Sequence, residues 1–172
     1  MSIPLSTIKS ALKIDYSDDD TTLILYREAA ESLISRETGL SLSPADRTMY
    51  LASFTDTAVP FLPFIQLKNI AYTDTAGNPQ TLDSAKWWID LADGPIPIVR
   101  FLDQPAIKEG TNITATVNSG YQEIPNELVH CVIALVGGWY NNPEAFQPIG
   151  LNAVPMSVDY ILASYRARSF LR

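Results

Sequence analysis

The most demanding feature of the sequence is an apolar run in its last third, LVHCVIALVGGWY at residues 128–140. A helix drawn through residues 125–141 carries apolar side chains at nearly every angle around its axis, and such a helix must be covered on every side. The run has 13 residues, fewer than the ~20 that a membrane-spanning helix needs. Either the rest of the chain wraps this helix, or one of its faces meets a neighbouring subunit.

Helical patterns flank a long β-rich region. Residues 6–39 place apolar side chains at helical spacing, and Gly39 supplies a stop. Residues 44–120 change to short β-rich runs broken by turn residues, among them Gly77 and Asn78, which favours antiparallel pairing. Helical spacing returns at residues 125–141, where Pro125 falls in the first turn, and at residues 157–170. This order predicts an α+β fold, packed as a single domain over residues 1–172.

Charge and cysteine content exclude several classes of protein. The net charge of −7 argues against sequence-reading nucleic-acid binding, which relies on clustered Lys and Arg. It equally disfavours anionic membrane surfaces. Cys131 is the single cysteine, so no intrachain disulfide forms, and the amino terminus lacks a signal peptide. We expect a soluble intracellular protein. Charged residues make up only 18% of the chain, low for a freely soluble monomer, so partners are expected to cover part of its surface.

Four aspartates precede the long helical pattern: Asp15, Asp18, Asp19 and Asp20. Ser17 and Asp20 have the spacing of a capping box, and carboxylates in a first turn meet the positive end of the helix dipole. An EF-hand loop would need alternating oxygen ligands, a central glycine and a glutamate at its twelfth position, and none of these follows. The aspartates therefore predict a helix start and no metal site.

The remaining candidates for chemistry are also better explained by structure. His130 is the only histidine and lies in the apolar helix, which predicts a core or interface residue. Phosphate-binding glycine motifs are absent. Trp87 and Trp88 are adjacent on a predicted strand and so face opposite sides, which leaves one of them available as an interface anchor. We predict no catalytic residues, no cofactor and no enzymatic activity.

The last predicted helix combines an apolar stripe with arginines. Val158, Ile161 and Leu162 share one face with Tyr165, and Arg166, Arg168 and Arg172 follow. Basic residues at a helix C-terminus complement its dipole. They would equally suit docking into an acidic groove.

Four segments together resemble a known family. They are IKSALKIDYSDDDTTLILYREAAESLISRETG, LPFIQLKNIAYTDTAGNPQTL, ITATVNSGYQEIPNELVHCVIALVGGWYNNPEAF and VPMSVDYILASYR, in this order and over nearly the whole chain. The pattern resembles the head-tail connector, or adaptor, proteins of tailed bacteriophages and prophages. The more specific parts are RETG, GYQEIPNEL, WYNNPE and ASYR.

This resemblance implies a structural role in the virion. It implies a homo-oligomeric ring, typically of twelve copies, made in the host bacterial cytoplasm and built into the neck between capsid and tail. The ring would bind the portal protein on one side and a stopper or tail-completion protein on the other. Phage DNA would pass through its centre during ejection without sequence-specific binding, and no membrane would be involved.

The resemblance also directs attention to particular residues. A head-to-tail ring uses two different patches on each subunit, and we expect residues 18–38 and 125–141 to supply them. The expected inter-subunit residues are Tyr26, Arg27, Val129, Trp139 and Tyr140. The expected portal-binding residues are Tyr160, Tyr165, Arg166, Arg168 and Phe170.

Two other functions stay open at this point. One is a metal-dependent hydrolase that uses the carboxylates of Asp15 to Asp20. The other is a tail-completion or stopper protein, which would contact the tail tube instead of the portal.

Overall fold

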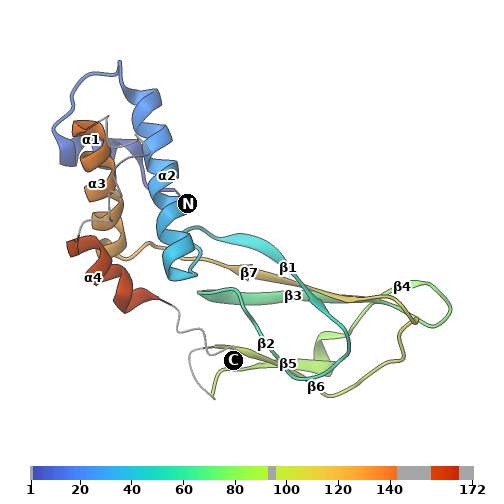
Figure 1. Cartoon of the computed structure of the whole chain (residues 1–172). Helices are drawn as coiled ribbons and strands as arrows, with labels where there is room; N and C mark the ends of the chain where they lie inside the picture. The colour runs from blue at the N-terminus through green and yellow to red at the C-terminus, as the bar shows by residue number, and fades with distance from the viewer. Residues whose placement is uncertain (1, 93–95, 143–155, 167–172) are drawn as a thin grey trace. The chain divides into compact units, whose positions relative to one another are not determined.

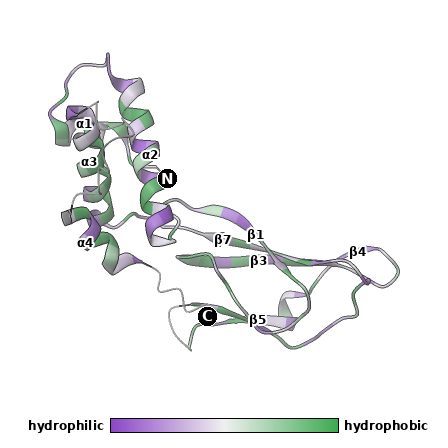
Figure 2. Ribbon diagram, viewed as in Figure 1, coloured by the Kyte–Doolittle hydropathy of each residue, from purple (hydrophilic) through white to green (hydrophobic). Residues whose placement is uncertain are grey.

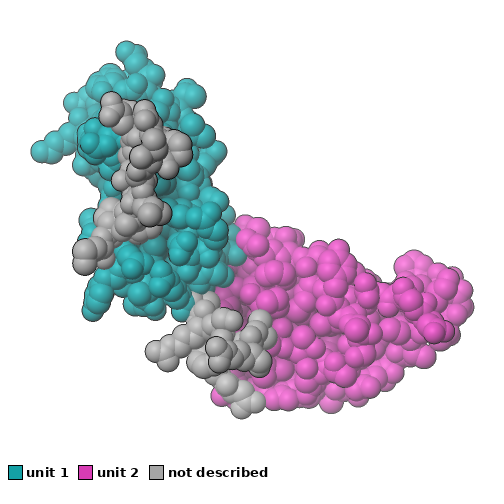
Figure 3. All heavy atoms as spheres, viewed as in Figure 1, with its two compact units in different colours: residues 1–43, 121–172 teal, residues 44–120 magenta. Residues whose placement is uncertain are grey.

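The computed structural model describes residues 2–92, 96–142 and 156–166 of the chain. It contains two compact units (Figure 3): a helical unit of residues 1–43 and 121–172, and a β unit of residues 44–120. The β unit is thus inserted in the sequence between the two parts of the helical unit. Helices near both ends of the chain and antiparallel strands between them confirm the predicted α+β class. The single domain over residues 1–172 stays a prediction.

The helical unit holds four helices (Figure 1). Its second helix ends where the sequence predicted, because Gly39 adopts the left-handed conformation with φ 73°. Pro125 lies one residue before the third helix, at its N-cap position, and not within the first turn. The predicted end of the last helix, residues 167–170, lies outside the described residues. The helices are α1 (Leu5–Leu12), α2 (Asp20–Thr38), α3 (Asn126–Asn141) and α4 (Met156–Tyr165).

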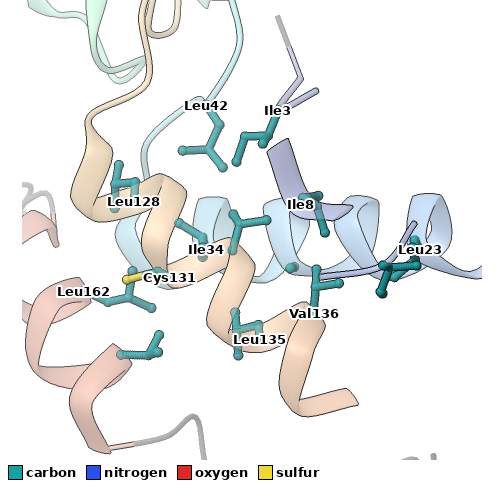
Figure 4. Close-up of a cluster of buried hydrophobic side chains, with 14 residues drawn as sticks. Ile3, Ile8, Leu23, Ile34, Leu42, Leu128, Cys131, Leu135, Val136 and Leu162 are labelled. Atoms are coloured by element: carbon teal, nitrogen blue, oxygen red, sulfur yellow. The ribbon is translucent and has the colours of Figure 1, made fainter. Parts of the chain in front are cut away.

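The core of the helical unit forms around α3, which contacts α1, α2 and α4. Figure 4 shows side chains from all four helices converging on one cluster. Apolar residues dominate α3 in the hydropathy colouring of Figure 2. Full burial of a Leu, Ile or Val side chain contributes about 1.5–3 kcal/mol, so this cluster fixes how the helices pack. Its buried members are Ile3, Ile8, Ile14, Leu23, Ala30, Ile34, Leu42, Leu128, Cys131, Val132, Leu135, Val136, Val158 and Leu162.

The rest of the chain covers only part of α3. Its buried face includes Leu128, Val132 and Leu135, whereas Val129 is half-buried and His130 is exposed. His130 was predicted to be a core or interface residue, and its exposure excludes the core alternative. An interface role for His130 stays a prediction.

The β unit contains two antiparallel sheets. One has the strand order β1-β7-β3-β4 and the other has the order β2-β6-β5. The first sheet joins β1 to β7 along its full length, from the pair Ala45 and Ser119 to the pair Leu51 and Ile113. The strands are β1 (Ala45–Leu51), β2 (Thr57–Ala58), β3 (Phe64–Thr73), β4 (Pro79–Thr81), β5 (Trp87–Asp90), β6 (Ile98–Phe101) and β7 (Ile113–Ser119), and a short 3-10 turn, η1 (Ser84–Lys86), precedes β5.

The two sheets share one apolar core. In β7 every second residue is buried, so one face packs inward while the threonines point outward. The ring of Phe54 bridges the sheets, since its centroid lies 5.4 Å from that of Tyr72 on β3 and 5.5 Å from that of Phe101 on β6. The buried members are Met49, Leu51, Phe54, Val59, Leu67, Ile70, Leu82, Val99, Ile113, Ala115 and Val117.

Two sequence predictions about strands are confirmed here. The turn between β3 and β4 contains Gly77, whose φ of 91° is a conformation that glycine adopts without strain. The backbone N–H of Asp74 donates to the carbonyl of Asn78 across this turn, at 3.0 Å. Trp87 packs against the core of the β unit, whereas Trp88 is 45% exposed on the opposite face of β5.

Adjacent glycines in α3 give a matched test of helix packing. A Cβ on Gly138 would meet no atom within 4 Å, so Gly138→Ala should stabilise the helical unit by about 0.5–1 kcal/mol through helix propensity. A Cβ on Gly137 would lie 2.8 Å from Cδ2 of Leu12, so Gly137→Ala should gain less or lose stability. Urea unfolding followed by helical circular dichroism measures both free energies of unfolding. Equal gains from the two variants would contradict the close approach of α1 and α3.

Candidate assembly surfaces

The helix α4 is fixed on the helical unit by its apolar stripe. Val158 and Leu162 are buried, and Ile161 and Tyr165 pack against the same cluster, which confirms the stripe predicted from the sequence. The opposite side of α4 faces solvent. Tyr160 is 82% exposed there, the largest exposure among the big apolar side chains of the described residues. A hydroxyphenyl ring held on a packed helix is a typical anchor for a partner protein.

Polar contacts tie the end of α4 to its neighbours. The hydroxyl of Tyr165 donates to Oε2 of Glu127 at the start of α3, at 2.6 Å, and this hydrogen bond raises the pKa of Tyr165 to about 12. The guanidinium of Arg166 lies 2.9 Å from a carboxylate oxygen of Asp159 and 3.8 Å from one of Glu37 on α2. Both contacts are partly exposed, so their main effect is to orient the helix.

The predicted portal-binding residues therefore fall into three groups. Tyr160 points away from the helical unit, and Tyr165 and Arg166 hold α4 in place while remaining at its end. Arg168 and Phe170 lie outside the described residues.

The predicted inter-subunit residues on α2 and α3 make contacts within the chain. The rings of Tyr26 and Trp139 meet edge to face, with centroids 6.2 Å apart. The guanidinium of Arg27 donates to the carbonyl of Ile3 at 3.2 Å. Val129 is half-buried against the helical core. These contacts order the α2 and α3 surface, and the inter-subunit role of the residues stays a prediction.

Tyr140, the last predicted inter-subunit residue, joins a network at the start of α2. Its hydroxyl donates to Oδ2 of Asp19 at 2.5 Å and lies 2.7 Å from the hydroxyl of Tyr16. The hydrogen bond to Asp19 and then that to Tyr16 raise the pKa of Tyr140 well above its usual value. The network joins the end of α3 to the segment between α1 and α2.

Two of the four aspartates at the start of α2, Asp19 and Asp20, make tertiary contacts. α2 begins at Asp20, so Ser17 lies too early to be its cap, and the side chain of the N-cap residue Asp19 makes no capping hydrogen bond. The capping-box prediction is therefore wrong, although Asp20 does lie in the first turn. Oδ1 of Asp20 pairs with Nζ of Lys9 on α1 at 2.6 Å. Within the described ranges, no group of three or more His, Cys, Asp or Glu side chains could hold a metal ion.

The β unit carries a further exposed surface on its three-stranded sheet. Residues on the outer face of β5 and β6 alternate with the core residues, and Trp88 lies directly opposite Arg100. Leu102, just after β6, is 70% exposed. On the other sheet, Tyr50 of β1 is also 70% exposed. The sequence pointed to one of the pair Trp87 and Trp88 without saying which, and it did not point to Tyr50 or Leu102, which stand in ordinary strand patterns.

Acidic side chains hold Arg100 in this surface. Its guanidinium lies 2.9 Å from Oδ2 of Asp56 and 3.0 Å from Oδ2 of Asp90. The backbone N–H of Ala92, and then Arg100, lower the pKa of Asp90 below its usual value. Two carboxylates around one guanidinium leave an excess negative charge beside Trp88.

The comparisons with known proteins bear on these surfaces. Residues 2–75 match the family of phage gp6-like head-tail connector proteins. This match confirms the predicted resemblance to head-tail connectors. No curated protein matches the chain.

Solved structures extend the likeness of fold to almost the whole chain. A chain from the neck of an empty gene transfer agent (GTA) particle, computed with C6 symmetry, has a TM-score of 0.76 at 20% identity, over 96% of this chain and 89% of that one. A chain from the virion of a native GTA particle has a TM-score of 0.75 at 19% identity, with the same coverage. A chain from the neck of a native GTA particle, computed with C12 symmetry, has a TM-score of 0.69 at 18% identity, over 96% and 92%. At these identities the likeness shows the fold. In addition, no helix in the described ranges is long and apolar enough to cross a membrane.

The contact between Tyr165 and Glu127 makes a spectroscopic prediction. Glu127→Gln removes the carboxylate acceptor, so the pKa of Tyr165 should fall from about 12 toward the usual value of about 10. Because the folded-state pKa is the higher one, the hydrogen bond stabilises the docked α4 below pH 10 and this contribution is lost as the pH rises through 12. The chain has eight tyrosines, so NMR of ring-labelled tyrosine with Tyr165→Phe for assignment is the suitable measurement.

The matched control is Glu123→Gln, an exposed carboxylate ahead of α3. It should leave the titration of Tyr165 unchanged. An unchanged titration in Glu127→Gln would show that Tyr165 does not hold α4 on α3.

Proposed function

We propose that the chain is a structural head-tail connector subunit of a tailed phage or phage-like particle. It joins the DNA-filled head to the tail in the neck of the virion and performs no reaction. The observation that carries this proposal is the match of residues 2–75 to the head-tail connector family. The likeness of fold to neck proteins over 96% of the chain supports extending the role beyond the matched residues.

The subunits form a closed ring, which we propose to contain twelve copies. Related neck structures were computed with C6 and C12 symmetry, which is compatible with this number. Head-to-tail contact requires two unlike patches on each subunit. DNA passes through the ring, and a net charge of −7 suits a channel that must not grip phosphates.

The ordered surface of α2 and α3 contributes to the subunit contacts. Internal contacts fix Tyr26, Arg27 and Trp139 in defined positions, so these side chains lose little entropy on association. On the same helix as Tyr26, Leu25 is exposed and offers apolar area to a neighbour. Val129 and Tyr140 belong to this surface as well.

The outer face of α4 binds the portal protein. Tyr160 is the anchor, since its ring is exposed while its helix is fixed by buried residues on the other side. Arg166 lies at the end of the same helix, where it pairs with Asp159 and Glu37, and on docking it exchanges these ion pairs for acidic groups of the portal. Tyr165 positions the helix, and Arg168 and Phe170 continue the predicted surface. The other side of the ring receives a stopper or tail-completion protein.

Replacing the anchor tests this assignment. Tyr160→Ala should weaken binding to purified portal by roughly 30-fold, the loss expected of a central aromatic contact worth about 2 kcal/mol. The circular dichroism and unfolding midpoint should not change, because Tyr160 is 82% exposed. Surface plasmon resonance against immobilised portal measures the effect.

The control is Leu102→Ala, which removes an exposed apolar side chain from the β unit. It should bind portal as the unchanged chain does. Equal portal affinities for Tyr160→Ala and the unchanged chain would reject the α4 assignment. Failure of the unchanged chain to bind portal, with binding to a tail-tube protein instead, would favour the stopper alternative.

A further inference from the structure

The β unit has four outer strands, and only two of them can accept another strand. β4 has three residues and begins with Pro79, which has no N–H to donate. β2 has only two residues, a length that protects an edge from strand addition. β1 extends over seven residues and β5 over four, and each pairs on one side only.

The outer edge of β5 has no neighbouring strand among the described residues. The N–H of Leu102 donates to the carbonyl of Lys86, which fixes the ladder: Trp88 and Asp90 point their backbone groups toward β6. Trp87 and Ile89 consequently direct their N–H and C=O groups away from β6. Over the described part of the chain, no other strand pairs with this edge or with the outer edge of β1.

Strand edges that have no neighbouring strand can pair with a strand of another molecule. Native proteins protect them by shortening, by proline, by charge or by covering them with another element. β4 is protected by its shortness and by Pro79, and β2 is protected by its shortness. β1 and β5 are longer and contain no proline. These two strands belong to different sheets, so they form two unlike edges on one subunit.

We propose that β1 of one copy of this chain adds to the free edge of β5 of the next copy. This inference rests on the proposed ring, and it identifies which surfaces of the β unit the copies use. One such contact covers both kinds of edge, and a closed ring leaves neither exposed. Backbone hydrogen bonds between the added strand and Trp87–Asp90 form the contact, as in other cases of strand addition.

Side chains beside the two edges are complementary. Trp88 on β5 and Tyr50 on β1 are both exposed, each on the face of its sheet that points away from the core. Aromatic cross-strand neighbours of this kind stabilise strand pairs.

Cross-linking of engineered cysteines tests the pairing of β1 with β5. The double variant Thr48→Cys with Trp88→Cys places one thiol at the centre of each edge strand. A second double variant, Thr48→Cys with Lys86→Cys, keeps the Trp88 ring in place. Cys131 is fully buried and should not react with the reagent. Each chain is assembled to rings on the portal or at high concentration and treated with a short bismaleimide.

Each double variant should give a ladder of covalent multimers on denaturing gels, extending beyond the dimer. Each single variant should stay monomeric, because β1 meets β5 and not another β1. Dimers from a single variant would show pairing of like edges and would overturn the proposal. Rings that form without any ladder would overturn the strand contact and leave the ring intact. A chain that enters no ring would overturn the proposed function together with this contact.

Discussion

The packing of α1, α2 and α4 around the apolar face of α3 is the interaction on which the rest of the structure depends. The two segments of the helical unit are separated by 77 residues of inserted β unit, residues 44–120, yet they share one core. Neither segment can bury its apolar stripe alone, because the partners of Leu128 and Val136 come from the other end of the sequence. Closing this core therefore brings the start and the end of the described chain onto one scaffold.

That scaffold explains how α4, a helix of low intrinsic stability, can offer an ordered surface to a partner. A ten-residue helix is marginal alone in water, and burial of Val158 and Leu162 stabilises it. What faces outward is then determined: the ring of Tyr160 on the exposed side, and Arg166 at the end of the helix. The β unit follows the same logic. Its core fixes the sheets, and no described strand pairs with the outer edges of β1 and β5. A chain with few charged residues thus offers defined surfaces for partners on both units.

Much of this fold could be predicted from local sequence patterns. The stop at Gly39, the turn at Gly77 and the stripe on α4 follow from conformational preference and periodicity, which act over a few residues. The aspartates before α2 could not be interpreted in this way. Asp20 pairs with Lys9, 11 residues earlier on α1, and Asp19 accepts from Tyr140, 121 residues later, so both contacts depend on how the helices pack. For the same reason His130 could not be placed: a helix apolar nearly all round does not reveal which face its neighbours leave open. The surfaces were predicted in part, through Trp88 and Tyr160, whereas the free strand edges needed the strand order.

The account rests on the chain being a ring subunit at the junction of head and tail. Cryo-electron microscopy of finished particles, with the neck reconstructed without imposed symmetry, tests this most directly. The account predicts a ring of density between portal and tail into which the helical unit and the β unit of this chain fit, repeated around the channel. Particles that contain no copy of the chain, or that carry it only at another site, would contradict it.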